Sequence, residues 1–139
     1  MVFHKRLEFK TGGDAEIIDL TGDVSDILRE TGLDSGLVNI FAPGSTAGIT
    51  TVEYESGLVR DIRQLMDELI PQNRDWAHNM TWGDGNGHSH LRASLFGPSL
   101  SVPIIDGRLV LGTWQQIIFI DFDNRPRNRS VVVTLIGEE

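Results

Sequence analysis

The sequence of 139 residues has no cysteine, few prolines and no long apolar run. The absence of cysteine excludes a disulfide framework, a thiolate zinc site, an iron–sulfur cluster and a cysteine nucleophile. Any metal ion would therefore need ligands from His, Asp, Glu or carbonyl oxygen. No apolar run approaches the ~20 residues of a membrane span, and the amino terminus lacks a signal-like apolar stretch. We therefore expect a cytoplasmic protein with no membrane partner.

Basic residues are scarce, with 12 Lys and Arg against 20 Asp and Glu, which gives a net charge of −8. A charge of this sign repels phosphate backbones, so nucleic acid is not an expected partner. The five prolines are scattered and no repeat or linker interrupts the chain, which predicts a single domain over residues 1–139. With 40% hydrophobic residues, a chain of this length can fill one core.

Hydrophobic periodicity predicts an α+β domain with more strand than helix. We expect a hairpin from strands 2–11 and 15–20, and strands 36–42 and 46–53 joined by a turn at 43–45. The expected helices are a short one capped by Thr21 or Asp23 and ending at Gly32, one over 57–70 capped by Ser56 and stopped by Pro71, and a short one from about residue 87 to 96. A long loop covers 71–89. Four final strands, at 99–105, 108–112, 115–122 and 130–136, predict an antiparallel meander whose first turn is Asp106-Gly107.

Three of the four histidines, His78, His88 and His90, fall within thirteen positions around a glycine-rich segment. Imidazole suits Zn, Fe, Ni or Cu, and Asp84 or Glu53 would add an oxygen ligand. On a strand His88 and His90 would share a face, whereas on a helix they would lie about 200° apart and could not chelate one ion together. A glycine-rich turn whose histidines bond to the backbone is the alternative interpretation.

Two further groups could bind phosphate. Ser45 and Thr46, together with Glu53 and Asp61, would hold a phosphate through a bound cation, although threonine is also common in ordinary strands. The alternating arginines of residues 125–129 would point one way in an extended segment, near Arg108. Clustered guanidinium groups bind phosphate or carboxylate, but charged residues also protect edge strands from aggregation.

Several motifs together resemble the YjbQ-like family, whose members are often labelled secondary thiamine-phosphate synthase. The resemblance spans about residues 36–137, and the Gly-Thr-Trp-Gln run is its most specific part. The matching segments are Gly85-Asn86-Gly87-His88-Ser89-His90-Leu91-Arg92-Ala93-Ser94-Leu95, Gly97-Pro98-Ser99-Leu100, Gly107-Arg108-Leu109-Val110-Leu111-Gly112-Thr113-Trp114-Gln115-Gln116-Ile117 and Asp121-Phe122-Asp123.

The resemblance implies a compact sandwich of mostly antiparallel strands with two or three helices. It also implies a homotrimer in which polar motif residues gather in a cleft near a subunit boundary. Many members have Pro-His-Thr-Thr-Ala where this chain has Pro43-Gly44-Ser45-Thr46-Ala47, so a histidine is missing at Gly44. The site residues that match the family pattern are Thr46, Glu53, Asp61, His78, Asn86, His88 and His90.

The family label implies joining a pyrimidine methyl diphosphate to a thiazole phosphate with release of pyrophosphate. In this hypothesis Glu53 and Asp61 hold Mg²⁺, Arg92 or Arg108 binds the diphosphate, and Trp82 packs on the pyrimidine. The expected catalytic residues are Glu53, Asp61, His78 and Asn86, and the expected substrate-binding residues are Ser45, Thr46, Arg92 and Arg108. The substrate would be a small phosphorylated metabolite.

Two alternatives remain open at this point. A metal-dependent hydrolase would use His78, His88 and His90 to hold a transition metal such as Zn²⁺ that activates water. A non-catalytic trimer would only retain a small molecule in the cleft. A divalent metal ion is thus the expected cofactor, Mg²⁺ or a transition metal, and no organic cofactor is expected.

Overall fold

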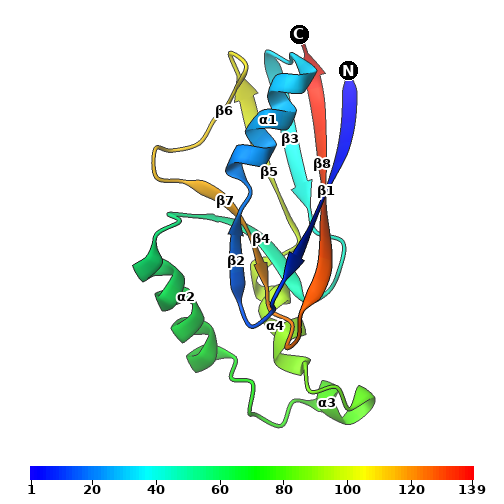
Figure 1. Ribbon diagram of the computed structural model, residues 1–139, viewed down its shortest axis with the longest axis vertical. Helices are drawn as coiled ribbons and strands as arrows, with labels where there is room; N and C mark the ends of the chain where they lie inside the picture. The colour runs from blue at the N-terminus through cyan, green and yellow to red at the C-terminus, as the bar shows by residue number, and fades with distance from the viewer.

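The computed structural model describes residues 1–139 as eight strands and four helices (Figure 1). Their order is β1 (Val2–Thr11), β2 (Glu16–Asp19), α1 (Thr21–Thr31), β3 (Ser35–Phe41), β4 (Ala47–Val52), α2 (Ser56–Leu69), α3 (Ala77–Trp82), α4 (Gly87–Phe96), β5 (Ser99–Ile105), β6 (Arg108–Leu109), β7 (Gln116–Asp121) and β8 (Arg127–Glu138). All strand pairs are antiparallel. They form a five-stranded sheet of order β1-β8-β3-β5-β6 and a three-stranded sheet of order β2-β7-β4. The predicted α+β class is confirmed.

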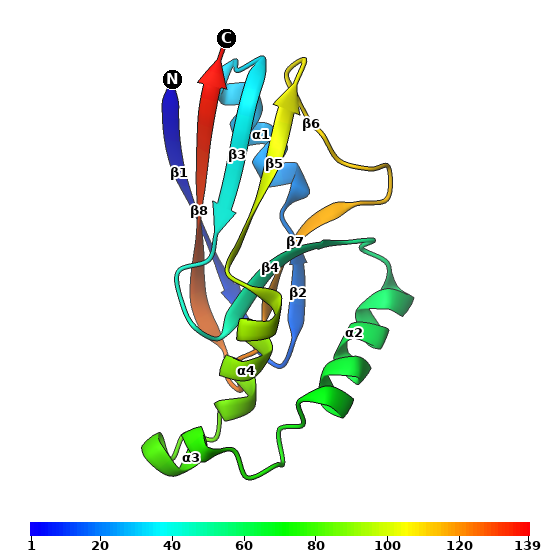
Figure 2. The same ribbon diagram turned by 180° about the vertical axis from the view of Figure 1, so that it is seen from behind.

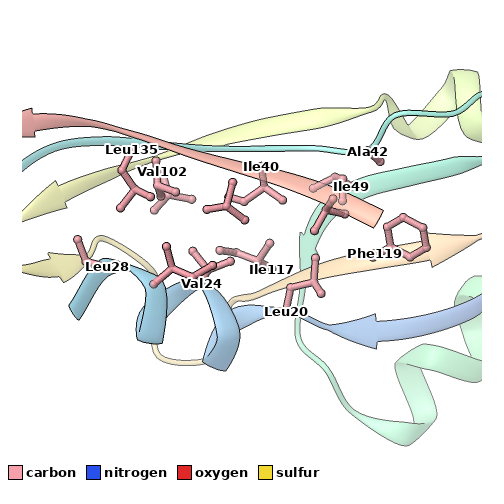
Figure 3. Close-up of a cluster of buried hydrophobic side chains, with 14 of the residues drawn as sticks. Leu20, Val24, Leu28, Ile40, Ala42, Ile49, Val102, Ile117, Phe119 and Leu135 are labelled. Atoms are coloured by element: carbon pink, nitrogen blue, oxygen red, sulfur yellow. The ribbon is translucent and has the colours of Figure 1, made fainter. Parts of the chain in front are cut away.

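The two sheets are held together by one apolar core that lies between them. Figure 3 shows side chains of the large sheet, such as Ile40, Val102 and Leu135, facing α1 and β7. α1 contributes Val24 and Leu28 and extends the layer of the small sheet. Burial of these side chains removes apolar surface from water at roughly 25 cal/mol per Å², which is the main force joining the layers.

β7 is buried on both faces, which explains its nearly continuous apolar sequence. Ile117 and Phe119 face the large sheet, whereas Ile118, Ile120 and Phe122 belong to a second apolar cluster on the opposite side. Side chains of α2 and α4 complete that second cluster. The fold therefore has three layers: the large sheet, the small sheet with α1, and the helices α2 and α4.

The strands lie where the sequence predicts them, but most of their predicted partners are wrong. β1 and β2 do not form a hairpin, because β1 pairs with β8 over ten residues and β2 pairs with β7. β3 and β4 lie in different sheets, so the segment at 43–45 crosses between layers. The predicted meander is limited to β5 and β6, since β7 joins the small sheet and β8 lies between β1 and β3. Periodicity indicates which face of a strand is buried and does not identify its neighbour.

The helix boundaries agree with the predictions more closely than the caps do. Gly32 ends α1 in a left-handed conformation, as expected. Neither Thr21 nor Asp23 caps α1, where the Asp19 carboxylate accepts from the Thr21 N–H. The cap of α2 is Glu55 in place of Ser56, because the Glu55 carboxylate accepts from the Gly57 and Leu58 N–H groups. The Asp106-Gly107 turn is confirmed, with φ of +52° and +71°. Four helices are present where two or three were expected, since α3 forms within the predicted loop at 71–89.

Different structural elements lie at the two ends of the molecule. Both termini and the β5–β6 turn lie at one end, and α3 and α4 lie at the other (Figures 1 and 2). None of the helices is long and apolar enough to cross a membrane.

Candidate functional site

The amino end of α4 is fixed against α3 by close backbone packing. The Gly87 N–H donates to Asn79 Oδ1 over 2.9 Å. A Cβ atom at position 87 would lie 2.9 Å from that oxygen and 2.9 Å from the Trp76 Cβ atom. Glycine is therefore required for this close approach. This close approach brings side chains of α3 and α4 into contact.

His78 of α3 and His90 of α4 form a pair of adjacent imidazoles. Their ring centroids are 4.4 Å apart and the planes are inclined by 41°. His78 Nδ1 is buried and has no hydrogen-bond partner. Burial and the neighbouring His78 ring lower the pKa of His90 below its ordinary value, against the opposing effects of Asp123 and Asp84. A neutral imidazole has one donor and one acceptor nitrogen, so the pair is suited to proton transfer.

The loop between β3 and β4 lies beside this pair and offers free backbone donors. The backbone N–H groups of Gly44, Ser45 and Thr46 have no acceptor within the chain. Against the larger effect of burial, a hydrogen bond to the Ser45 backbone raises the pKa of His90, as a carbonyl acceptor does, which places the loop next to the histidine pair. Consecutive unpaired N–H groups form anion-binding concavities. Gly44 has φ of +137°, a conformation that L side chains rarely adopt, so a histidine at this position would require a different loop conformation.

A buried network of ion pairs contacts this loop through the Thr46 hydroxyl. Asp121 and Asp123 are almost fully buried at the end of β7. Arg129 binds Asp121 in bidentate geometry through Nε and Nη2, both at 2.7 Å, and Nη2 also donates to the Thr46 hydroxyl at 2.7 Å. Arg127 Nε donates to Asp123 at 2.9 Å. Burial raises the pKa of Asp123, but hydrogen bonds from the Asn124 N–H and Arg127 outweigh it and hold the pKa below its usual value.

The network leaves part of one guanidinium free near the loop. Arg129 Nη1 has no hydrogen-bond partner and lies 3.5 Å from the position of a Cβ atom at Gly44. Hydrogen bonding to Asp121 raises the pKa of Arg129, so its charge persists. The buried Asn86 amide lies between two carboxylates: its Nδ2 atom is 3.5 Å from Asp123 Oδ1, and in the alternative amide orientation it donates to Asp84 Oδ1 over 2.9 Å. A cavity of about 190 Å³ opens beside the loop, lined by Gly44, Ser45, Ser94 and neighbouring small residues.

The structure brings five of the predicted site residues together and places the others elsewhere. The five that gather at this end are Ser45, Thr46, His78, Asn86 and His90. Glu53 follows the far end of β4, about 20 Å along the strand from the loop, and Asp61 is exposed on α2. Arg108 lies on β6 at the opposite end of the molecule, where it lines a recess beside α1.

His88 and Arg92 lie on another face of α4. Both are buried, and they line a separate cavity with Asp14 and Asp67. The expected separation of His88 from His90 on a helix is confirmed by α4. No group of three or more His, Asp or Glu side chains is placed to hold a metal ion. The residues of a single chain therefore do not fit the predicted three-histidine metal site.

Sequence reasoning missed the free N–H groups of the loop and the role of the buried aspartates. The alternating arginines at 125–129 gave a partial signal, since Arg127 and Arg129 do bind carboxylates. Those carboxylates belong to Asp121 and Asp123 of the same chain, which leaves Arg129 Nη1 and the two Nη atoms of Arg127 without a partner. The acidic pair that ends β7, followed by the arginines four and eight residues later, is the pattern that could have shown the network.

The fold and site define a small α+β protein in which two sheets and a helical layer hold a histidine pair beside a loop with three unpaired N–H groups. Residues 5–138 match the family model described as UPF0047 protein YjbQ-like. A UPF0047 protein of Methanothermobacter thermautotrophicus is 39% identical over 137 residues, covering 99% of this chain and 94% of that protein. The UPF0047 protein YugU of Bacillus subtilis is 38% identical, covering 96% of this chain and 98% of that protein.

Solved structures agree with the sequence relatives. A YbjQ-like protein of unknown function from Sulfolobus solfataricus superposes with a TM-score of 0.94 and 34% identity, covering 99% of both chains. A YjbQ/UPF0047 family protein from Clostridium acetobutylicum superposes with a TM-score of 0.87 and 38% identity, covering 95% of this chain and 99% of that one. The chain belongs to the YjbQ-like UPF0047 family, as its motifs suggested.

Proposed function

We propose that the protein is an enzyme that acts on a small phosphorylated metabolite, with the phosphate held by the β3–β4 loop. The observation that carries the proposal is the position of three unpaired N–H groups, at Gly44, Ser45 and Thr46, beside the His78–His90 pair. Fixed N–H donors stabilise charge that develops on a phosphate or diphosphate oxygen. Arg129 Nη1 would add a charged donor at the same place.

The reaction to test first is the thiamine-phosphate synthase reaction that the family label suggests. In it the thiazole nitrogen donates its electron pair to the pyrimidine methylene carbon, a C–N bond forms, and the C–O bond to diphosphate breaks. The diphosphate leaves with the electron pair of that bond. The loop N–H groups would bind this leaving group, and an imidazole N–H of His90 would hydrogen-bond to its oxygen. Glu53 and Asp61 play no part in this arrangement, because they lie away from the loop.

The synthase test supplies both substrates and Mg²⁺ and measures thiamine phosphate formed per protein molecule. We expect multiple turnovers with the unchanged protein, and a decrease of about 10²- to 10⁴-fold for His90→Gln or His78→Gln, the range of general acid–base groups. His4→Gln is the matched control, since His4 is exposed on β1 and is the one histidine outside the motif region.

A direct binding measurement tests the proposed phosphate site independently of the reaction. Calorimetric titration with inorganic pyrophosphate should show one site per chain, and Ser45→Pro, which removes one loop N–H group, should weaken it by about tenfold or more. Binding without turnover would leave the non-catalytic alternative, in which the trimer only retains its ligand. Absence of both binding and turnover would overturn the proposal.

A metal-dependent hydrolase is the second candidate, because adjacent imidazoles such as His78 and His90 favour a transition metal. This candidate needs at least one further ligand that the single chain does not place there. Elemental mass spectrometry of untagged, native protein tests it. One transition metal ion per chain, lost in both His78→Gln and His90→Gln, would favour the hydrolase, and substoichiometric metal in active protein would exclude it.

A further inference from the structure

A second cavity, of about 290 Å³, lies on the side of α4 that faces α2 and the turn between β1 and β2. Its charged lining consists of two arginines and two aspartates, Arg63, Arg92, Asp14 and Asp67, with His88 beside them. None of these residues takes part in the site proposed above. A cavity of this size is at the lower end of those that bind small molecules.

Arg92 and Asp67 form an ion pair at 3.2 Å, but the other two charges of this cavity are not neutralised within the chain. Asp14 and Arg63 form no ion pair, and the only hydrogen bond of the Arg63 guanidinium goes from Nε to the Ala15 carbonyl at 3.3 Å. Arg92 uses Nε and Nη2 to bind the Ile70 carbonyl and Asp67, which leaves Nη1 without a partner. Each half of the lining therefore retains capacity for a charged ligand.

His88 adds a buried imidazole with one unpaired nitrogen, since its Nε2 atom contacts the Ser89 hydroxyl at 3.4 Å. Its side chain is 2% exposed, and its Nδ1 atom has no hydrogen-bond partner. Leaving a buried polar atom unpaired is unfavourable. Burial, and next the charge of Arg92, lower the pKa of His88, which keeps the ring neutral and leaves the arginines as the cations of the cavity.

The turn that carries Asp14 is strained. Asp14 and Ala15 have φ of +51° and +65°, a conformation that is unfavourable for residues other than glycine. Their N–H groups are anchored to the Asp123 and Asp121 carbonyls, both at 2.7 Å. The conformation brings the Asp14 side chain to the cavity and turns the Ala15 carbonyl toward Arg63. Strained residues held in this way cluster at binding sites.

We propose that this cavity binds a small zwitterion of the amino-acid type, with its carboxylate on Arg63 and Arg92 and its ammonium group on Asp14 and Asp67. The balance of charges selects this chemistry. A simple anion would meet two carboxylates, and a simple cation would meet two guanidinium groups, whereas a zwitterion places each charge opposite its counterpart. Guanidinium groups bind carboxylates through parallel N–H donors, and carboxylates accept from ammonium.

The test is calorimetric titration with glycine, β-alanine and γ-aminobutyrate, which differ in the separation of their two charges. Acetate and methylammonium, at the same ionic strength, each carry one of the two charges. We expect at least one zwitterion to bind one site per chain, about tenfold or more tighter than either single-charge probe. Equal binding of acetate would indicate a plain anion site and overturn the proposal, as would the absence of binding by all three zwitterions.

Variants of the lining residues, each with a matched control elsewhere in the chain, test whether the zwitterion binds in this cavity. Asp14→Asn keeps a residue that tolerates positive φ, and Arg63→Gln keeps a helix-forming residue, so both are expected to fold. Each should weaken the best zwitterion by about tenfold or more. The controls are Asp106→Asn, at the other aspartate with positive φ, and Arg60→Gln, one turn earlier on α2. Equal affinity in variants and controls would show that the zwitterion binds elsewhere and would refute the assignment.

Discussion

Replacing Arg129 by methionine should destabilise the protein severely, because it leaves a buried carboxylate without its counterion. Asp121 is fully buried and receives two 2.7 Å bonds from Arg129. Removing one partner of a buried ion pair costs about 3–5 kcal/mol, since the remaining charge stays desolvated. Domains of this kind have free energies of unfolding of about 5–15 kcal/mol. The loss is therefore a large fraction of the total.

The assay is urea unfolding followed by far-UV circular dichroism at one fixed protein concentration. Arg125→Met is the matched control, because Arg125 is exposed in the neighbouring turn and forms no ion pair; its effect should stay within about 0.5 kcal/mol. The double variant Asp121→Asn, Arg129→Met removes the stranded charge, so it should recover part of the stability lost in Arg129→Met.

Acid distinguishes a charge effect from a packing effect. Acid favours the neutral form of a buried carboxylate that lacks a counterion, so lowering the pH should remove the penalty in Arg129→Met. The difference between the unchanged protein and the variant should therefore shrink as the pH falls. A loss below about 1 kcal/mol, or a loss that does not depend on pH, would refute the account of the network given above.

Three further outcomes are expected. Because the pKa values of His88 and His90 are lowered, the unfolded chain binds more protons below the ordinary value of 6.5, and the free energy of unfolding should fall from about pH 7 to about 5. His88→Gln should flatten this dependence, and an unchanged slope would contradict it. Gly48→Ala places a Cβ atom 2.7 Å from the Phe96 Cβ atom, so it should destabilise by about 1–3 kcal/mol, whereas Gly22→Ala, which meets nothing within 4 Å, should not; urea unfolding compares them. Light scattering should give the mass of a trimer, and a mass near 15.4 kDa would exclude one.

Sequence patterns predicted the individual elements well because their causes are local. The apolar stripe of α2 and its stop at Pro71, the left-handed end of α1 at Gly32, and the Asp106-Gly107 turn each depend on neighbours within a few residues. Strand pairing is different. β1 and β8 are separated by most of the chain, and nothing in either segment identifies the other as its partner.

Prediction of the site had the same limit, because contacts between distant segments could not be inferred from the sequence. The motif around Asn86 was visible, and helical geometry correctly separated His88 from His90. The contact of His90 with His78 was not predictable, because it depends on α3 forming in a segment rich in turn residues and on Gly87 allowing close packing. Glu53 and Asp61 were predicted to hold a phosphate through a metal ion because carboxylates are suitable ligands, and nothing in the sequence indicated their positions. Their separation follows from the length of β4 and from the exposed position of Asp61 on α2.

The two faces of α4 explain why one short motif contributes side chains to two different sites. Asn86 and His90 are four residues apart and share one face, and His88 and Arg92 share another. The first face meets α3 and the β3–β4 loop, and the second meets α2 and the strained β1–β2 turn. The backbone of that turn is anchored to Asp121 and Asp123, the same residues whose side chains support the loop. A ligand at either face would therefore act on a shared framework, which is why each site needs its own set of variants.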